Sequence, residues 1–135
     1  MGQHWIPSKK SRYYVPRETF LTVMHYCRQY PLWMAELNTG ASTVRAIRYD
    51  MDKVQASGNS DPTFAAAVRR AAIERKKTQI DETAKEVADG MADWLIQGVC
   101  YGRTYYQLRE KGIPCGKNMY YKWRRKFYYM MAQKI

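Results

Sequence analysis

Apolar residues recur along this chain at the three- and four-residue spacing that places them on one face of a helix. A first helix is predicted from Pro16 to just before Pro31, because proline suits the first turn of a helix and restricts the residue before it. Its apolar positions are Phe20, Leu21, Met24 and Cys27. Further helices are predicted over residues 32–37 and 43–55. No alternation with a period of two is long enough for a sheet, so the predicted fold class is all-α.

A long central helix is predicted from residue 63 to residue 89. The preceding Ser60-Asp61-Pro62 supplies a capping side chain followed by proline in the first turn. An apolar residue recurs every seven positions, at Ile73, Ile80, Val87 and Trp94. This repeat predicts packing within the chain or, as the alternative, the seam of a homodimer. Another helix is predicted over residues 91–100, after Gly90.

Two more helices joined by a tight turn are predicted after residue 100. Thr104 and Gln107 have the spacing of a capping box, which marks the start of the first of them. Gly112 is placed to end it, because glycine accepts the left-handed conformation found after a helix C-terminus. The last helix is expected to open at residues 115–116 and to run to the end of the chain. The pair predicts a helix-turn-helix.

The last predicted helix has an apolar side and a polar side. The residues expected to face the core are Met119, Tyr120, Trp123, Phe127 and Met130. The polar side, which includes Tyr128, is expected to enter a DNA major groove, where Lys and Arg bind guanine edges and Asn binds adenine. The residues expected in the groove are Lys117, Asn118, Tyr121, Lys122 and Arg125. The residues expected to contact the DNA backbone are Arg103, Arg109 and Arg124.

The charge distribution favours the same surface. The chain has 135 residues and a formal net charge of +11. Residues 101–135 carry nine Lys or Arg and one acid, Glu110, a net of +8, whereas residues 61–100 have a net charge of −1. A basic C-terminal segment beside a nearly neutral middle favours a polyanionic partner. The sequence thus divides into a flexible basic arm (1–15), an N-terminal helical region (16–57) and the long helix with the helix-turn-helix (61–135).

Catalytic and metal-binding patterns were not found in the sequence. Cys27, Cys100 and Cys115 are odd in number and widely spaced, which predicts free thiols and a reducing cytoplasm. His4 and His25 lie far apart and have no Cys or Asp at metal-ligand spacing. No enzyme activity, cofactor or metal is therefore expected. No apolar run approaches the roughly 20 residues of a membrane-spanning helix, and no signal peptide is recognised.

Three short motifs resemble the phage-encoded late transcriptional regulators of the RinA and ArpU family, found in phages and prophages of Gram-positive bacteria. They lie within residues 25–135 and are Tyr30-Pro31, Ser60-Asp61-Pro62-Thr63 with the Ala-rich stretch after it, and Tyr120-Tyr121-Lys122-Trp123-Arg124-Arg125-Lys126-Phe127. The resemblance implies an all-helical protein whose C-terminal helix-turn-helix is similar to sigma-factor region 4. It also implies activation of late genes, such as packaging and lysis genes, in the cytoplasm of a bacterial host. Lys122, Arg124 and Arg125 match the basic positions of the closing motif.

The sequence differs from the usual pattern of that family at the turn and in the helix before it. Family members often have serine or threonine where the last helix begins, and this chain has Cys115 and Gly116. The helix before the turn carries Tyr105 and Tyr106 where the usual pattern has an alanine after an isoleucine.

The first functional hypothesis is a sequence-specific regulator of transcription that binds double-stranded DNA, acts as an activator and contacts host RNA polymerase. The alternative is a protein-interaction module whose basic last helix docks an acidic partner, such as a polymerase subunit or a packaging protein. A third reading is binding to a membrane surface or to RNA without sequence preference, which an aromatic and basic helix allows.

Overall fold

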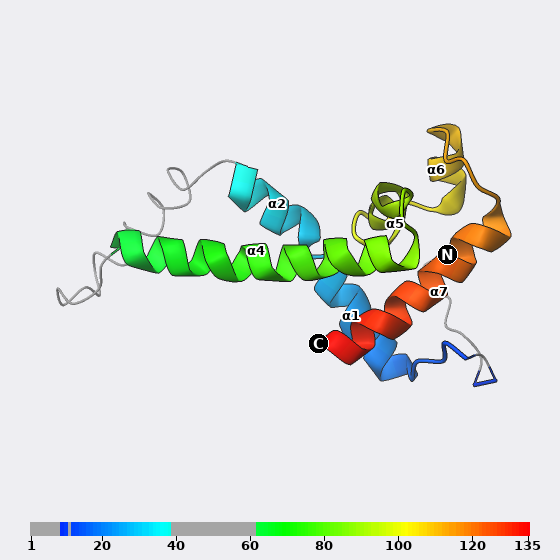
Figure 1. The fold of residues 1–135 in the computed structure, drawn as a ribbon, viewed down its shortest axis with the longest axis horizontal. Helices are drawn as coiled ribbons and strands as arrows, with labels where there is room; N and C mark the ends of the chain where they lie inside the picture. Colours follow the sequence, from blue (N-terminus) through cyan, green and yellow to red (C-terminus); the bar gives the residue numbers. More distant parts are fainter. Residues whose placement is uncertain (1–8, 11, 39–61) are drawn as a thin grey trace. The chain divides into compact units, whose positions relative to one another are not determined.

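The structure is a computed structural model, and it describes residues 9–10, 12–38 and 62–135. These residues form an all-α structure, and no strand occurs among them (Figure 1). The helix expected at 43–55 and the residues from 56 to 61 lie outside the described residues. The helices are α1 (Arg17–Cys27), α2 (Tyr30–Asn38), α4 (Pro62–Val87), α5 (Ala92–Val99), α6 (Tyr105–Glu110) and α7 (Lys117–Lys134).

The observed helix bounds follow local sequence signals. Pro16 is the residue before α1, and its carbonyl accepts the first helical hydrogen bond, from the Phe20 amide at 2.8 Å. Pro31 occupies the first turn of α2, because a proline lacks an amide hydrogen that the first turn would leave unpaired anyway. Pro62 begins α4 in the same way. The helices predicted from the sequence within the described residues are therefore confirmed to within a few residues at each end.

The contacts within the chain define two units. The C-terminal unit comprises residues up to 30 and from 80 to 135, and the central unit comprises residues 31–79. Helix α4 contributes its first part to the central unit and its last part to the C-terminal unit. The sequence-based division near residues 57–61 differs from this one, since α1 belongs with the helices at the other end of the chain.

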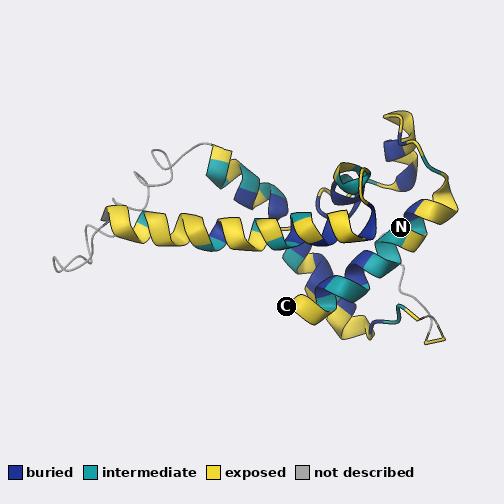
Figure 2. Ribbon diagram, in the orientation of Figure 1, coloured by how far each residue is buried: buried dark blue, intermediate teal, exposed yellow. Residues whose placement is uncertain are grey.

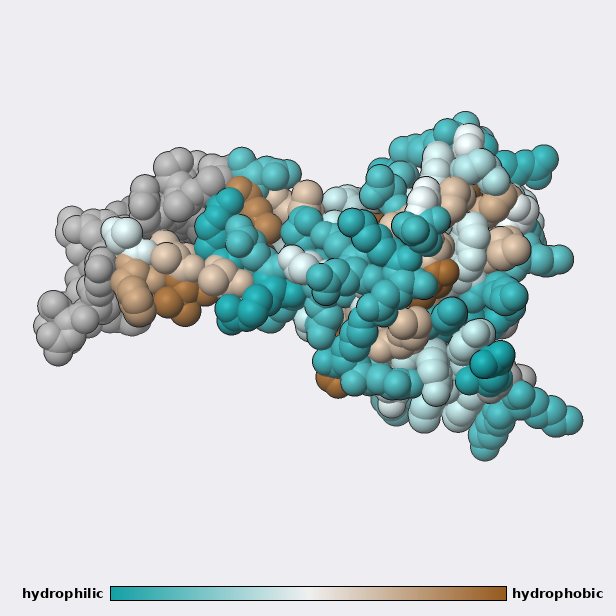
Figure 3. Space-filling model, viewed as in Figure 1, coloured by the Kyte–Doolittle hydropathy of each residue, from teal (hydrophilic) through white to brown (hydrophobic). Residues whose placement is uncertain are grey.

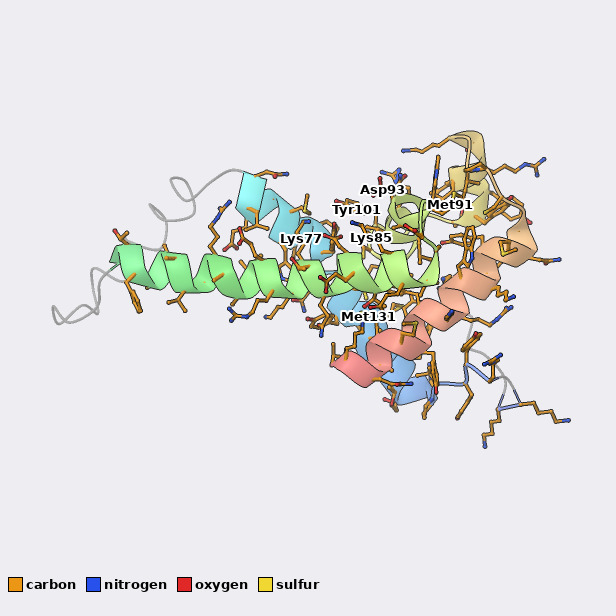
Figure 4. All side chains as sticks on the ribbon, in the orientation of Figure 1. Lys77, Lys85, Met91, Asp93, Tyr101 and Met131 are labelled. Carbon is orange, nitrogen blue, oxygen red and sulfur yellow. The ribbon has the colours of Figure 1, made fainter. Side chains whose placement is uncertain are left out.

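The core of the C-terminal unit brings α1 against α7. The ring of Phe20 on α1 lies 4.7 Å from the ring of Tyr128 on α7, measured between centroids. Phe20, Phe127 and Met131 have no exposed surface, and Tyr128 is 2% exposed. Figure 2 shows buried positions along both α1 and α7, and Figure 4 labels Met131 on α7. Leu95 of α5 and Leu108 of α6 are also fully buried.

Three further contacts tie the end of α1 and the residues after it to α4 and α5. The hydroxyl of Tyr30, the first residue of α2, donates a 2.7 Å hydrogen bond to Oδ1 of Asp81 on α4. Cys27 and Cys100 are both buried and free, and a hydrogen bond with Cys27, together with burial, raises the pKa of the Cys100 thiol. Arg28 donates from Nε to the Val99 carbonyl at 3.2 Å. These contacts close the unit around residues that are distant in sequence.

The buried face of α7 differs from the prediction. Tyr120 and Phe127 are buried as expected, but Met119 is 46% exposed, and Trp123 and Met130 are only half-buried. The prediction that Tyr128 lies on the polar side is wrong, because Phe20 of α1 packs against it. The buried face is therefore turned toward Tyr128 and Met131 relative to the one expected from α7 in isolation.

The segment before α1 is packed against α7. Val15 is 2% exposed, and the rings of Tyr13 and Tyr129 lie 5.7 Å apart. Residues 13–15 of the predicted flexible arm are therefore packed within the C-terminal unit. Residues 1–8 and 11 of the predicted arm lie outside the described part of the chain.

The central unit is held by contacts between α2 and the first half of α4. Arg69 donates two hydrogen bonds to the Glu36 carboxylate, from Nε at 2.7 Å and from Nη2 at 3.0 Å. Lys76 lies over the ring of Trp33, 5.8 Å from its centroid. Trp33 and Ile73 are buried, whereas Phe64 near the start of α4 is 67% exposed.

Candidate nucleic-acid interface

Helix α6 begins with the capping box that the sequence predicted. The Thr104 hydroxyl accepts a 3.2 Å hydrogen bond from the Gln107 amide, and the Gln107 side-chain oxygen accepts a 2.9 Å bond from the Thr104 amide. The two bonds satisfy backbone donors that a helix start otherwise leaves unpaired. The start of a helix of only six residues is thereby fixed.

The end of α6 is fixed by glycine, as predicted. Gly112 has a φ of 99°, and its amide donates to the Arg109 carbonyl at 3.0 Å. The Ile113 amide donates to the Leu108 carbonyl at 3.1 Å. This pair of bonds is the Schellman motif, and the burial of both Ile113 and Leu108 supplies its apolar contact.

The turn from α6 to α7 is held from the side by Tyr105. Its hydroxyl donates a 2.8 Å hydrogen bond to the Cys115 carbonyl, and its ring lies 5.7 Å from the ring of Tyr120. Gly116 is the residue before α7 and has an extended backbone. Because Tyr105 and Tyr120 are both buried, the first turn of α7 is anchored to α6 by packing as well as by a hydrogen bond.

An exposed lysine–tyrosine contact bridges the two helices. Lys117 Nζ donates to the Tyr106 hydroxyl at 2.9 Å and lies 5.1 Å from the centroid of that ring. The hydrogen bond raises the pKa of Lys117 and lowers the pKa of Tyr106, and the charge of Arg109 lowers the pKa of Tyr106 further. Tyr106 is not among the contact residues predicted from the sequence. Its exposure could have been predicted from helix periodicity, because a helix that turns Tyr105 and Leu108 inward turns residue 106 outward.

Four of the predicted DNA-contacting residues are exposed around this bridge. Arg109 lies three residues after Tyr106 on the outward side of α6, and Lys122 lies four residues after Asn118 on α7. We call these residues and their aromatic neighbour the cationic turn surface: Tyr106, Arg109, Lys117, Asn118 and Lys122. This surface presents ammonium, guanidinium, amide and phenol groups around the turn. Such groups bind phosphates and base edges.

The other four predicted contact residues are half-buried. The Arg124 guanidinium lies 5.1 Å from the centroid of the Tyr128 ring, on the side of α7 that faces the core. Arg103 Nε is buried and has no hydrogen-bond partner. Tyr121 and Arg125 flank the outward side of α7. The structure thus brings four of the predicted residues together at the turn and leaves Arg103 and Arg124 packed more closely.

No group of three or more His, Cys, Asp or Glu side chains that could hold a metal ion occurs among residues 9–10, 12–38 and 62–135. In the same part of the chain, none of the helices combines the length and the apolar character needed to cross a membrane.

Comparison with known proteins gave no match to any family model, curated protein or solved structure. The resemblance to the RinA and ArpU regulators therefore stays a prediction.

Proposed function

We propose that the protein binds double-stranded DNA in a sequence-specific manner through α6, the following turn and the first half of α7, and thereby regulates transcription. The observation that carries this proposal is the cationic turn surface. Its residues are exposed, while the capping box, the Schellman motif and the Tyr105–Cys115 hydrogen bond fix the backbone beneath them. A fixed backbone lowers the conformational entropy lost on binding.

The side chains fit the chemistry of a major groove. Asn118 is suited to the two hydrogen-bonding groups of an adenine edge, and Lys122 to the acceptors of guanine. Tyr106 and Arg109, on the helix before the turn, are placed to contact phosphates. In helix-turn-helix proteins the base contacts come from the first turns of the second helix, which is where Asn118 and Lys122 lie on α7.

The class of target follows from the resemblance. The proposed regulator acts in the cytoplasm of a bacterial host on late genes of a phage or prophage, such as packaging and lysis genes. Activation would require a contact with host RNA polymerase as well as with DNA. Arg124, stacked on Tyr128, would then support α7 and not bind DNA directly.

Selection of duplexes from a random library tests the proposal. The wild-type protein is expected to enrich one sequence, and a palindromic sequence would indicate a dimer. Asn118→Ala should weaken binding to the selected duplex by about 1–3 kcal/mol and change binding to random DNA far less. Lys85→Ala, which removes an exposed charge from α4, is the matched surface control. A library without any enriched sequence would refute sequence-specific binding.

A second candidate function is docking of an acidic protein partner on the central unit. Phe64 and Val68, four residues apart on α4, are both exposed, and Arg75 lies on the same face and is exposed too. Figure 3 shows hydrophobic side chains over the first turns of α4. This strip fits a helix that offers apolar side chains and a carboxylate, as a subunit of RNA polymerase or a packaging protein could.

Binding to purified bacterial RNA polymerase after nuclease treatment tests the second candidate. Phe64→Ser combined with Val68→Ser should weaken the complex, and Asn118→Ala should leave it unchanged. Loss of polymerase binding in Asn118→Ala only would move the docking surface to the C-terminal helices.

A further inference from the structure

The segment that precedes α1 carries cations and is fastened to α7. Val15 is buried, and the ring of Tyr13 packs on the ring of Tyr129 at 5.7 Å. The Arg12 guanidinium lies 5.3 Å from the centroid of the Tyr13 ring and is exposed. Lys9 and Lys10 are exposed as well. Three cations are therefore carried by a segment whose end is fixed against the last helix.

The attachment point lies on the outward side of α7. Asn118, Lys122, Arg125 and Tyr129 are spaced by four, three and four residues, so they form one stripe along the helix. This stripe is opposite to the buried side of α7, which is defined by Tyr120, Phe127 and Met131. The side of α7 that carries Asn118 and Lys122 is thus the same side on which Tyr13 packs.

The length of the stripe decides where the arm would lie on DNA. Tyr129 lies eleven residues after Asn118, which corresponds to about 17 Å along a helix. In helix-turn-helix complexes the base contacts come from the first turns of the second helix. If Asn118 reaches the base edges inside the groove, Tyr129 and the cations attached to it lie beyond these contacts, beside the phosphates that border the groove.

We propose that Lys9, Lys10 and Arg12 bind the phosphates at the edge of the groove that α7 enters. This inference rests on the proposed DNA-binding function and adds a second, sequence-independent contact to it. The Tyr13–Tyr129 contact holds these three cations on the DNA-facing side of α7. Phosphate contacts fix the orientation of a protein on a duplex without reading its sequence.

The salt dependence of DNA binding tests the arm. The variant Lys9→Ala/Lys10→Ala/Arg12→Ala should bind the selected duplex at least about tenfold more weakly than wild type, and the slope of log affinity against log salt should fall by about 2–3. The loss should be the same on random DNA. The control Arg70→Ala/Lys76→Ala/Lys85→Ala removes three exposed cations from α4 and should retain the wild-type slope.

A second variant tests whether the position of the three cations matters as well as their charge. Tyr13→Ala keeps every cation but removes the ring that packs on Tyr129, so its binding should also weaken, whereas Tyr13→Phe should bind as wild type does. A selected duplex with neutral methylphosphonates at the groove edge should reduce wild-type affinity and abolish the difference between wild type and the triple arm variant.

The outcomes separate this inference from the proposed function. An arm variant with wild-type affinity and slope, on a duplex that wild type selects, overturns the arm contact and leaves the proposed function standing. A wild-type protein that selects no duplex overturns the proposed function and the arm contact with it. Equal losses in the arm variant and the α4 control also overturn the inference, because the effect would then report net charge only.

Discussion

Gly98 on α5 lies where any side chain would collide with α7. A Cβ atom at this position would be 1.7 Å from the Tyr120 hydroxyl oxygen and 2.9 Å from Cζ of the same ring. Tyr120 is buried and has little room to move away. Overpacking costs about 1–3 kcal/mol, and an approach this close puts the cost at the upper end, above the roughly 1 kcal/mol that alanine gains over glycine inside a helix. Gly98→Ala should therefore lower the free energy of unfolding by about 1–2 kcal/mol in urea titrations.

Two variants control this prediction. Tyr120→Phe removes the colliding oxygen, so Gly98→Ala should cost much less in that background, as a double-mutant cycle would show. Gly116→Ser tests a glycine with open space around it and an extended backbone. The free energy of unfolding of Gly116→Ser should equal that of wild type or exceed it by a few tenths of a kcal/mol, about the gain from a serine that caps α7. An equal cost of Gly98→Ala in both backgrounds would contradict the close approach of α5 and α7.

Buried tyrosines predict a loss of stability in alkali. Burial raises the pKa of Tyr120 to about 12 from an ordinary value of 10.0, and burial also raises the pKa of Tyr128. The neutral phenol is favoured in the folded protein, so its contribution is complete below pH 10 and is lost as the pH rises toward the folded pKa. Between pH 10 and 12 Tyr120 should reduce the free energy of unfolding by about 1.4 kcal/mol per pH unit.

Denaturation at a series of alkaline pH values measures this slope. Tyr120→Phe should make the slope shallower than in wild type. Tyr106→Phe should not make the slope shallower, because the pKa of this exposed tyrosine is lowered by its hydrogen bond with Lys117. A slope that is identical in wild type and Tyr120→Phe would show that Tyr120 ionises as readily in the folded protein as in the unfolded chain.

Among the elements, α6 depends most clearly on its two ends. A helix of six residues is too short to be stable in isolation, since helix nucleation is unfavourable. Thr104→Ala removes one half of the capping box and should lower the free energy of unfolding by about 1 kcal/mol. Thr104→Ser retains the hydroxyl and should be close to wild type. Hydrogen exchange at the α6 amides would detect the local opening, and equal protection in the two variants would contradict a stabilising cap.

The ends of the helices could be predicted from sequence because they depend on local signals. The capping box at Thr104, the positive φ of Gly112 and the prolines at the starts of helices all act within a few residues of themselves. The inward positions of α5 and α6 could also be predicted. Each of these helices has only one apolar stripe, so periodicity leaves a single choice of face.

The buried face of α7 could not be predicted in the same way. Aromatic and methionine side chains surround much of this helix, so its apolar side is broad and its periodicity does not select one orientation. The orientation depends on Phe20, which packs on Tyr128 from a helix about a hundred residues earlier in the chain. The same kind of distant contact, Tyr13 with Tyr129, fixes part of the arm that the sequence predicted to be flexible.

In the candidate site too, the residues that depend on local signals could be predicted, and those that depend on distant contacts could not. Lys117, Asn118 and Lys122 could be identified because they lie early in the helix after a predicted turn, where helix position alone places them outward. Arg124 could not be placed correctly, because its packing on Tyr128 depends on the orientation of α7 as a whole. The exposure of Tyr106 could also have been predicted from its position in α6.

At the scale of the whole molecule, the C-terminal unit is closed by its two sequence ends. Helix α1 packs on α7, so the candidate site on α7 depends on residues near the start of the chain. Phe20→Ala should cost about 3–5 kcal/mol, because it deletes a fully buried ring. Since this is a large part of the stability of a small protein, Phe20→Leu provides a milder variant that should cost about 1–1.5 kcal/mol.

Phe64→Ala is the matched control, because it makes the same substitution at a phenylalanine that is 67% exposed in the central unit. It should change the free energy of unfolding by no more than about 0.5 kcal/mol. Chemical denaturation followed by circular dichroism would compare the three variants. Because α1 supports the orientation of α7, Phe20→Leu should also weaken DNA binding, whereas Phe64→Ala should not. Equal stability losses at Phe20 and Phe64 would mean that α1 does not form the core on which α7 rests.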